Sequence, residues 1–270
     1  MTLIDDPKGW FRRRFGLRYP SLDTLGFKLS GVLVMEQGLF EPTETTMILR
    51  LLDTVEVLVN VGANIGYYCC HAMARGKRTV AVEPFPRNVR ILRANAAANG
   101  WSGLLEAHPV ALAAREGVMR LYGGGTAASL VPGWAGQRFG RKVRVSTLDG
   151  ILGDRFANSP VLVVIDVEGA ELGVLEGAAR TLAAPVRPIW FVEIAVNEHQ
   201  PRGLTINPNL VATFDLMDRA GYHAYSVAAE PRRVTPGEAR RIAETGTDTF
   251  ETHNFLFVSP ERAAALELPG

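Results

Sequence analysis

Short apolar runs alternate with amphipathic stretches along most of the chain. The apolar runs predict buried strands at 55–61, 79–82, 104–112, 161–166, 189–194, 222–227 and 254–258. The stretches between them place apolar residues at helical spacing and predict helices at 43–52, 65–75, 86–99, 147–152, 170–181 and 210–220. Two short strands are expected at 118–122 and 143–146, around a glycine-rich connection. Such alternation is typical of an α/β domain with a mainly parallel sheet and helices on both faces.

The first 40 residues differ from this pattern and predict an N-terminal extension (1–40) ahead of one domain at 41–270. Residues 10–15 mix aromatic and basic side chains. We expect them to form a partly exposed helix on the domain, with a membrane surface or a partner as the alternative contact. Residues 27–34 predict a short strand or hairpin.

A glycine-containing turn follows the first buried strand, with the sequence Gly62-Ala63-Asn64-Ile65-Gly66. Gly62 has no side chain, so it permits a tight turn and close approach of a ligand to the backbone. Gly66 permits close packing where the next helix starts. Ligands of open α/β sheets bind at the carboxyl ends of the strands, so the turn marks a candidate binding site. Phosphate-binding turns look similar, and the glycines alone do not identify the ligand.

The second strand ends in an acid, Glu83, which lies 21 positions after Gly62. A carboxylate at this place can accept hydrogen bonds from the ribose hydroxyls of an adenosine. The turn lacks the Gly-x-Gly-x-x-Gly pattern that brings a pyrophosphate onto a helix end. The methionine part of S-adenosylmethionine has no phosphate, and the Asn64 side chain suits its amino and carboxylate groups. S-adenosylmethionine is therefore favoured as the cofactor, with an NAD-dependent oxidoreductase as the alternative.

Two further strands end in carboxylates, Asp166 and Glu193, at the same expected edge of the sheet. Two carboxylates close together either share a proton or bind a divalent cation, so a metal at Asp166 and Glu193 stays open. Glu168 lies in the turn after Asp166. Glu171 lies at a helix start, where the helix dipole favours a negative charge.

Together these motifs resemble the FkbM family of S-adenosylmethionine-dependent methyltransferases. The matching segments are 61–68, 82–88, 147–149, 165–171, 175–178, Glu193 and 254–258. The resemblance implies a Rossmann-like methyltransferase fold with a mainly parallel seven-stranded sheet. It also implies methyl transfer to a hydroxyl of a small molecule, such as a sugar, a glycolipid or a secondary metabolite. The expected cofactor-binding residues are Asn60, Gly62, Ala63, Asn64, Gly66, Glu83, Pro84, Ala111, Ser129 and Asp166.

The chain departs from the family pattern at two positions. Asn60 stands where the family usually has Asp, and Val164 stands where it usually has Lys. The first replacement removes a charge near the sulfonium side of the cofactor, and the second removes a cation from the expected cleft. A non-catalytic binding module on the same fold therefore remains a further alternative.

Methyl transfer to an alcohol requires a group that takes the hydroxyl proton. A positioned base of this kind contributes about 10²–10⁴-fold to the rate. The candidates are Asp166, Glu168, Glu193 and His199, of which His199 is expected on a loop over the cleft. The sequence does not rank them.

Composition narrows the expected partners. The 270 residues include 29 Lys and Arg against 28 Asp and Glu, a balance that argues against a nucleic-acid-binding surface. The two cysteines are adjacent, Cys69 and Cys70, which fits neither a disulfide framework nor a metal site. With no signal peptide or membrane-spanning run evident, a cytoplasmic protein is expected. A homo-oligomer stays open.

Overall fold

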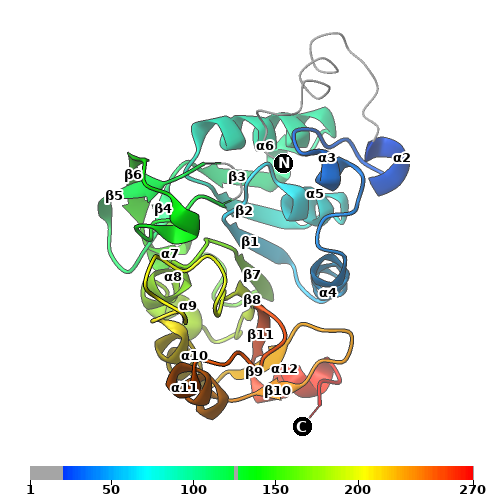
Figure 1. The fold of residues 1–270 in the computed structure, drawn as a ribbon. Helices are drawn as coiled ribbons and strands as arrows, with labels where there is room; N and C mark the ends of the chain where they lie inside the picture. The colour runs from blue at the N-terminus through cyan, green and yellow to red at the C-terminus, as the bar shows by residue number, and fades with distance from the viewer. Residues whose placement is uncertain (1–20, 125–126, 270) are drawn as a thin grey trace.

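An eight-stranded sheet runs through the computed structural model, which describes residues 21–124 and 127–269 (Figure 1). Its strand order is β10-β9-β11-β8-β7-β1-β2-β3. The strands are β1 (Val57–Val61), β2 (Arg78–Val82), β3 (Leu105–His108), β7 (Val161–Ile165), β8 (Ile189–Glu193), β9 (His223–Ser226), β10 (Arg233–Val234) and β11 (Asn254–Val258).

The sheet is parallel from β3 to β8, whereas β11 runs antiparallel to both β8 and β9. The predicted mainly parallel α/β sheet is therefore confirmed. It has eight strands instead of the expected seven because the two-residue β10 pairs with the outer edge of β9.

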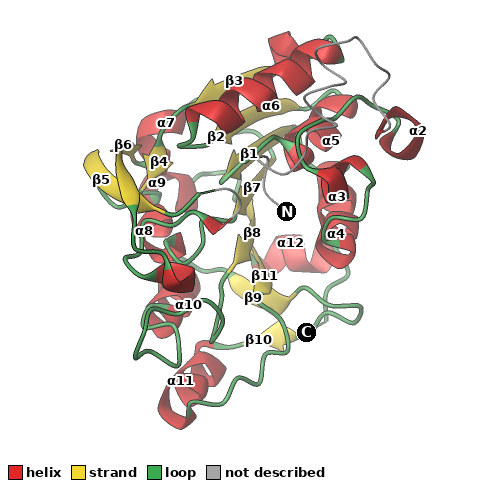
Figure 2. Cartoon of the chain, turned by 45° about the horizontal axis from the view of Figure 1, so that its top comes forward, coloured by secondary structure: helices red, strands yellow, loops and turns green. Residues whose placement is uncertain are grey.

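Helices cover both faces of the sheet (Figure 2). One face carries α3 (Leu33–Glu36), α4 (Pro42–Leu52), α5 (Tyr67–Ala74), α6 (Pro86–Ala98) and α12 (Pro260–Ala265). The other face carries α7 (Leu148–Leu152), α8 (Glu171–Glu176), α9 (Ala179–Leu182), α10 (Leu210–Arg219) and α11 (Pro236–Thr245). The short α2 (Ser21–Leu25) lies beside α3. This arrangement is the Rossmann-like fold that was predicted.

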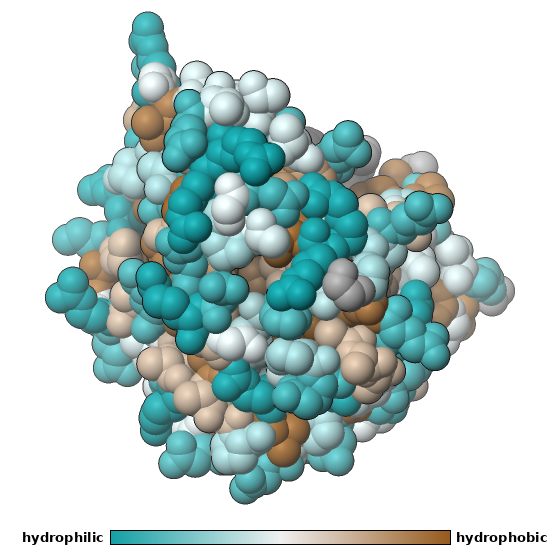
Figure 3. Space-filling model, turned by 90° about the horizontal axis from the view of Figure 1, so that it is seen from below, coloured by the Kyte–Doolittle hydropathy of each residue, from teal (hydrophilic) through white to brown (hydrophobic). Residues whose placement is uncertain are grey.

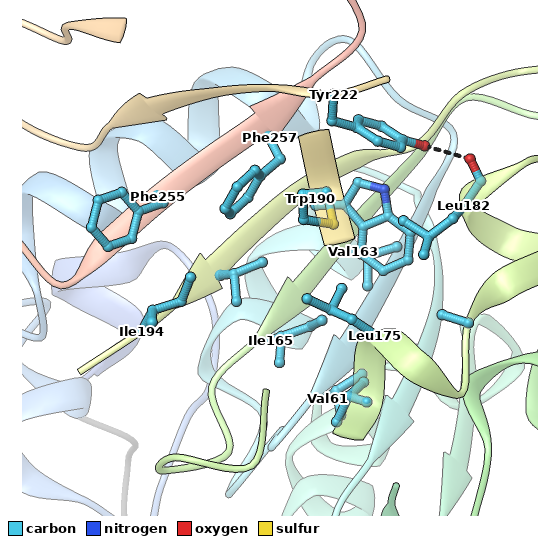
Figure 4. Close-up of a cluster of buried hydrophobic side chains, with 14 of the residues drawn as sticks. Val61, Val163, Ile165, Leu175, Leu182, Trp190, Ile194, Tyr222, Phe255 and Phe257 are labelled. Carbon is cyan, nitrogen blue, oxygen red and sulfur yellow. Dashed lines mark hydrogen bonds between the residues drawn. The ribbon is translucent and has the colours of Figure 1, made fainter. Parts of the chain in front are cut away.

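Alternate residues of each central strand belong to different cores. In β7, Val163 and Ile165 pack with α8, while Leu162 and Val164 pack with the helices of the other face. This alternation follows from the two-residue period of a strand. In the core on the side of α8, the rings of Trp190 and Tyr222 lie together. The Tyr222 hydroxyl donates a hydrogen bond to the Leu182 carbonyl (3.0 Å; Figure 4).

A smaller three-stranded sheet lies beside the main one, in the order β4-β6-β5 (Figure 1). Its strands are β4 (Ala111–Leu112), β5 (Gly117–Tyr122) and β6 (Gly140–Ser146), and short 3-10 turns lie at η2 (Ser102–Leu104) and η4 (Trp134–Gly136). The single strand predicted at 104–112 is thus divided between two sheets. Pro109 lies between β3 and β4, and its ring nitrogen has no hydrogen to donate to a ladder.

Two other local predictions need correction, and one helix was not predicted. Residues 27–34 form no strand, because the backbone at Ser30 exchanges hydrogen bonds with the Asn95 side chain of α6. The helix predicted at 170–181 is divided into α8 and α9 near Gly177, where an added Cβ would lie 2.5 Å from the Ala113 carbonyl oxygen. Helix α11 was not predicted, although Thr235 and Glu238 form a capping box at its start.

The segment before α4 is part of the packed structure. Phe27, Leu29, Val32 and Met35 are buried in the same core as α4 and α5. The predicted aromatic and basic segment at 10–15 lies outside the described residues. The boundary at residue 40 stays a prediction.

The hydrophilic surface and the free, buried cysteines are typical of an ordinary folded domain. Hydrophilic side chains cover most of the face seen in Figure 3, where apolar atoms show only in small separate patches. Cys69 and Cys70 are both free and buried. Within the described part of the chain, no helix combines the length and the apolar character needed to cross a bilayer.

Candidate active site

The carboxyl ends of four strands meet at one edge of the main sheet. Val61 of β1 lies opposite Val82 of β2 and opposite Ile165 of β7. Ile165 in turn lies opposite Val192 of β8. The residues that follow in register are Gly62, Glu83, Asp166 and Glu193, so the sheet brings together the strand ends that the sequence singled out.

A cavity of about 270 Å³ opens over this edge. The residues expected at the site that line it are Asn60, Gly62, Ala63, Asn64, Glu83, Pro84, Ala111, Asp166, Glu168 and Glu193. The other three expected residues, Gly66, Ser129 and His199, lie outside its lining. The turn at Gly62 and the acid at Glu83 therefore face one hollow, as their proposed joint role requires.

Gly62 is needed because two pieces of backbone approach each other there. Its φ is +86°, and an added Cβ would lie 1.7 Å from the carbonyl oxygen of Asp166. The sequence predicted close approach of a ligand at this glycine, whereas the structure shows close approach of the end of β7. Gly66 also has a positive φ, +88°, and packs against Leu92 of α6, as predicted for the helix start.

Glu83 is held by the backbone on two sides. Its Oε2 accepts a hydrogen bond from the Asn64 amide (2.9 Å), and its Oε1 accepts one from the Phe85 amide (2.8 Å). Burial raises the pKa of Glu83 to about 7, although these hydrogen bonds oppose the shift. The Asn88 side chain also interacts with this carboxylate. An ionised carboxylate has about four acceptor sites, so Glu83 keeps acceptor capacity for a ligand.

Positions 60 and 164, at which the sequence analysis expected a departure from the family pattern, are direct partners across β1 and β7. Val164 is buried in the core under α5, not in the cavity. The Asn60 amide reaches the Cys69 sulfur at 3.6 Å. The two departures therefore occur in one cross-strand pair.

Asp166 and Glu193 form the acidic end of the cavity. Burial raises the pKa of both carboxyl groups, and the negative charge of Asp166 also raises the pKa of Glu193. Glu41 and Glu168 add to the effect on both. No described residue donates a hydrogen bond to the side chain of Asp166 or Glu193. The pair therefore favours a state that holds a proton or a bound cation.

Glu168 lines the cavity and also contacts Trp134, Ser129 and His199, which lie outside the lining. Its backbone has a φ of +57°, and its Oε2 accepts a hydrogen bond from the Trp134 ring nitrogen (2.8 Å). His199 is exposed on the outer side, with its Nδ1 3.6 Å from the same oxygen. Ser129 donates its hydroxyl hydrogen to the Glu168 carbonyl (2.5 Å). Ser129 and His199 therefore contact Glu168 instead of the cavity.

Glu171 does not line the cavity. Its Oε1 accepts a hydrogen bond from the Gly169 amide (2.7 Å), at the start of α8. Burial raises the pKa of this carboxyl to about 7. Gly169 precedes the N-cap Ala170, so this contact ties the turn after β7 to the first residue of α8 and does not cap the helix.

The sequence analysis missed the wall that comes from α4 and α5. Glu41, immediately before α4, and Tyr67 and Tyr68 at the start of α5 line the cavity. The Tyr68 hydroxyl donates a hydrogen bond to Glu41 Oε2 (2.7 Å), and burial raises the pKa of Glu41 to about 7. Glu41 has a φ of +41°, and it is followed by Pro42, a helix-start signal that could have drawn attention to it.

The proposed metal at Asp166 and Glu193 finds no further support. Among residues 21–124 and 127–269, no group of three or more His, Cys, Asp or Glu side chains is arranged to hold a metal ion.

The cavity lies at the carboxyl edge of a Rossmann-like sheet, where proteins of this fold bind their ligands. The sequence model of the methyltransferase FkbM domain matches residues 60–224, more than half of the chain. This chain therefore belongs to the FkbM methyltransferase family.

The chain is similar to solved methyltransferase structures at low sequence identity. An FkbM methyltransferase from Methylobacillus flagellatus KT is 18% identical over 96% of this chain, with a TM-score of 0.45. This chain spans 62% of that protein. An O-methyltransferase from Bacillus cereus, solved with S-adenosylhomocysteine, is 13% identical over 95% of this chain and 96% of its own, with a TM-score of 0.47. No curated protein sequence matches the chain.

Proposed function

We propose that this chain transfers the methyl group of S-adenosylmethionine to a hydroxyl of a small molecule. The observation that carries the proposal is that the turn at Gly62–Asn64 and the Glu83 carboxylate face one cavity. Family membership favours a methyltransferase over the NAD-dependent oxidoreductase considered from the sequence.

The end of the cavity at β1 and β2 would hold the cofactor. The remaining acceptor capacity of Glu83 would bind the ribose hydroxyls. Phe85, Ala111 and Leu112 provide apolar surface beside that carboxylate for an adenine ring. Asn60, Asn64 and the backbone at Ala63 would contact the methionine part, on the side nearer to Asp166.

The end at β7 and β8 would hold the acceptor. Bound S-adenosylmethionine supplies a methyl group on a positively charged sulfur, which is already a strong electrophile. The residues at this end have to align the acceptor oxygen with that methyl group, and such positioning is worth roughly 7–11 kcal/mol of the barrier. The oxygen–carbon bond forms as the sulfur–carbon bond breaks.

Asp166 is the strongest candidate for the group that takes the hydroxyl proton. It lies next to Gly62 at the junction of the two ends of the cavity, and its raised pKa brings its basicity closer to that of a useful base at neutral pH. Glu193 lies beside it and would share the proton. Glu168 is fixed to Trp134, and His199 lies outside the cavity, so both fit a supporting role better.

Binding of S-adenosylhomocysteine, measured by calorimetry, tests the proposal. We expect saturable binding, and we expect Glu83→Ala to weaken it about tenfold or more, the scale of a lost hydrogen bond to a charged group. Glu106→Ala is the matched control, because Glu106 lies on the adjacent strand β3 but pairs with Arg155 outside the cavity. Equal affinities for the two variants would remove Glu83 from the cofactor site, and no binding by the folded wild-type chain would overturn the function.

A further inference from the structure

The lining of the cavity has an unusual charge balance. Five carboxyl groups line it, those of Glu41, Glu83, Asp166, Glu168 and Glu193. Within the described ranges 21–124 and 127–269, no lysine, arginine or histidine lines it. A ligand with a negative charge near β7 and β8 would therefore meet repulsion that no described lining residue offsets.

The five carboxyl groups differ in how they are satisfied. Glu83 accepts two backbone hydrogen bonds, Glu41 accepts one from Tyr68, and Glu168 accepts one from Trp134. Asp166 and Glu193 accept none from a described residue, although both face the cavity. The polar groups of the protein therefore leave this adjacent pair for something that the cavity takes in.

A protonated amine is the ligand that fits this pair best. Its positive charge offsets two neighbouring carboxylates, and its three N–H groups can donate to both of them. Raised pKa values show that the pair holds a proton more readily than ordinary carboxyl groups do. An ammonium group would replace that proton and let both groups ionise. A metal ion is less suited, because the described residues supply no third ligand.

We propose that the methyl acceptor is an amino alcohol, such as an amino sugar or an aminocyclitol, whose ammonium group binds between Glu193 and Asp166. Glu41, on the facing wall, adds a third negative charge. The hydroxyl that receives the methyl group lies beside the ammonium, on the Asp166 side. Acceptors with a phosphate or a carboxylate near this hydroxyl are excluded by charge. This inference rests on the proposed function.

Matched pairs of probes test the inference on protein loaded with S-adenosylhomocysteine. The pairs are methyl glucosaminide with methyl glucoside, and 1-amino-2-propanol with 1,2-propanediol. The two members of each pair differ only by an amino group in place of a hydroxyl group. By calorimetry at pH 7, we expect the amine of each pair to bind at least about tenfold more tightly, the effect of one charged hydrogen-bonded contact.

The Glu193→Gln variant tests whether the preference for the amine depends on Glu193. It should reduce the preference for the amine about tenfold and change the affinity for S-adenosylhomocysteine less than about twofold. Glu198→Gln is the control, because Glu198 lies five residues later, is exposed and does not line the cavity. A loss of S-adenosylhomocysteine affinity in Glu193→Gln would instead assign the pair to the cofactor's own ammonium group and overturn the inference.

Proton release gives an independent readout. When an amine binds at pH 7, the pair should release its shared proton, so the observed heat should depend on the ionisation enthalpy of the buffer. The charges that act on the pair are those of Glu41, Glu83, Glu168 and Glu171, with the Tyr68 hydroxyl nearby. The neutral probes should show no such dependence.

The outcomes separate the two proposals. If the protein does not bind S-adenosylhomocysteine, the proposed function fails. If it binds S-adenosylhomocysteine but binds both members of each pair equally, only the amine inference fails. The same follows if neither amine shows saturable binding up to about 50 mM, the weak end of specific recognition, or if the preference survives Glu193→Gln.

Discussion

The two ends of the cavity use the same structural device with opposite results. At the end formed by β1 and β2, a strand-end carboxylate, Glu83, is fixed by the amides of Asn64 and Phe85. At the end formed by β7 and β8, the strand-end carboxylates of Asp166 and Glu193 accept no hydrogen bond from the described residues.

The difference shows how one sheet edge can combine a rigid site with an adaptable one. A carboxylate held by two amides has its geometry set before a ligand arrives, which suits a cofactor that is common to a whole family. Two carboxylates that repel each other destabilise the empty protein, and a ligand that relieves the repulsion gains the corresponding free energy. Such sites are costly to stability and are typical of functional regions.

The largest expected effect comes from adding a side-chain carbon at Gly62, where the two ends of the cavity meet. Gly62→Ala would place a Cβ against the Asp166 carbonyl, and we expect the free energy of unfolding to fall by about 3 kcal/mol or more. Chemical denaturation measures the loss. Gly76→Ala is the control, because Gly76 has a similar φ of +71° but no atom within 4 Å of an added Cβ. It should cost only the left-handed backbone strain, about 1–2 kcal/mol. Equal losses would mean that the close approach of β1 and β7 does not matter.

The next largest effect is expected for Asp166→Asn, which should change the rate of methyl transfer but not cofactor binding. Asp166→Asn keeps the shape of the side chain but cannot take the hydroxyl proton. Turnover should fall at least about 100-fold, while the affinity for S-adenosylhomocysteine changes less than about threefold. Once an acceptor is in hand, mass spectrometry of the methylated product measures the rate. Turnover within a few-fold of wild type would show that another group is the base.

The charge coupling at the acidic end is expected to appear in the pH profile. The Glu168 carboxylate raises the pKa of Asp166, so Glu168→Gln should lower that pKa. Asp166 must be ionised to act as a base, and activity is lost as the pH falls through its pKa. The acidic limb of kcat/KM should therefore move to lower pH by about one unit, equivalent to about 1.4 kcal/mol. A limb that does not move would contradict the coupling.

The smallest effect concerns the wall from α4 and α5. Tyr68→Phe removes the hydroxyl that stabilises the ionised form of Glu41, so the raised pKa of Glu41 should rise further. A raised carboxyl pKa destabilises the fold as the pH increases from about 4.5 through the folded value. The variant should therefore lose about 1 kcal/mol at pH 8 and less at pH 5. Thermal or urea unfolding at the two pH values measures this, and an equal loss at both would contradict it.

The strand-end acids were predictable because each ends an apolar run. Parallel strands that alternate with helices must bring Glu83, Asp166 and Glu193 to one edge, whatever the details of packing. The wall formed by Glu41 and Tyr68 was not predictable in the same way. These residues come from two different helix starts, and no periodic pattern in the sequence indicates that they meet.

Contacts between distant segments also determine which residue approaches Gly62 and where the chain passes from one sheet to the other near Pro109. The sequence shows that Gly62 can allow a close approach, but only the pairing of β1 with β7 shows that the Asp166 backbone makes it. An apolar pattern likewise continues through Pro109, and the missing amide hydrogen there separates two sheets. Local patterns predicted the elements, whereas contacts between distant segments determined their neighbours.

The position of β11 bears on how the protein is synthesised. Residues 254–258 are translated after all other strands, yet they fill the gap between β8 and β9. Until they leave the ribosome, both flanking strands expose unpaired backbone that can pair with other chains. Truncations that remove this strand should therefore yield aggregated protein and not a smaller active domain. A nascent chain halted before residue 254 would be a substrate for chaperones.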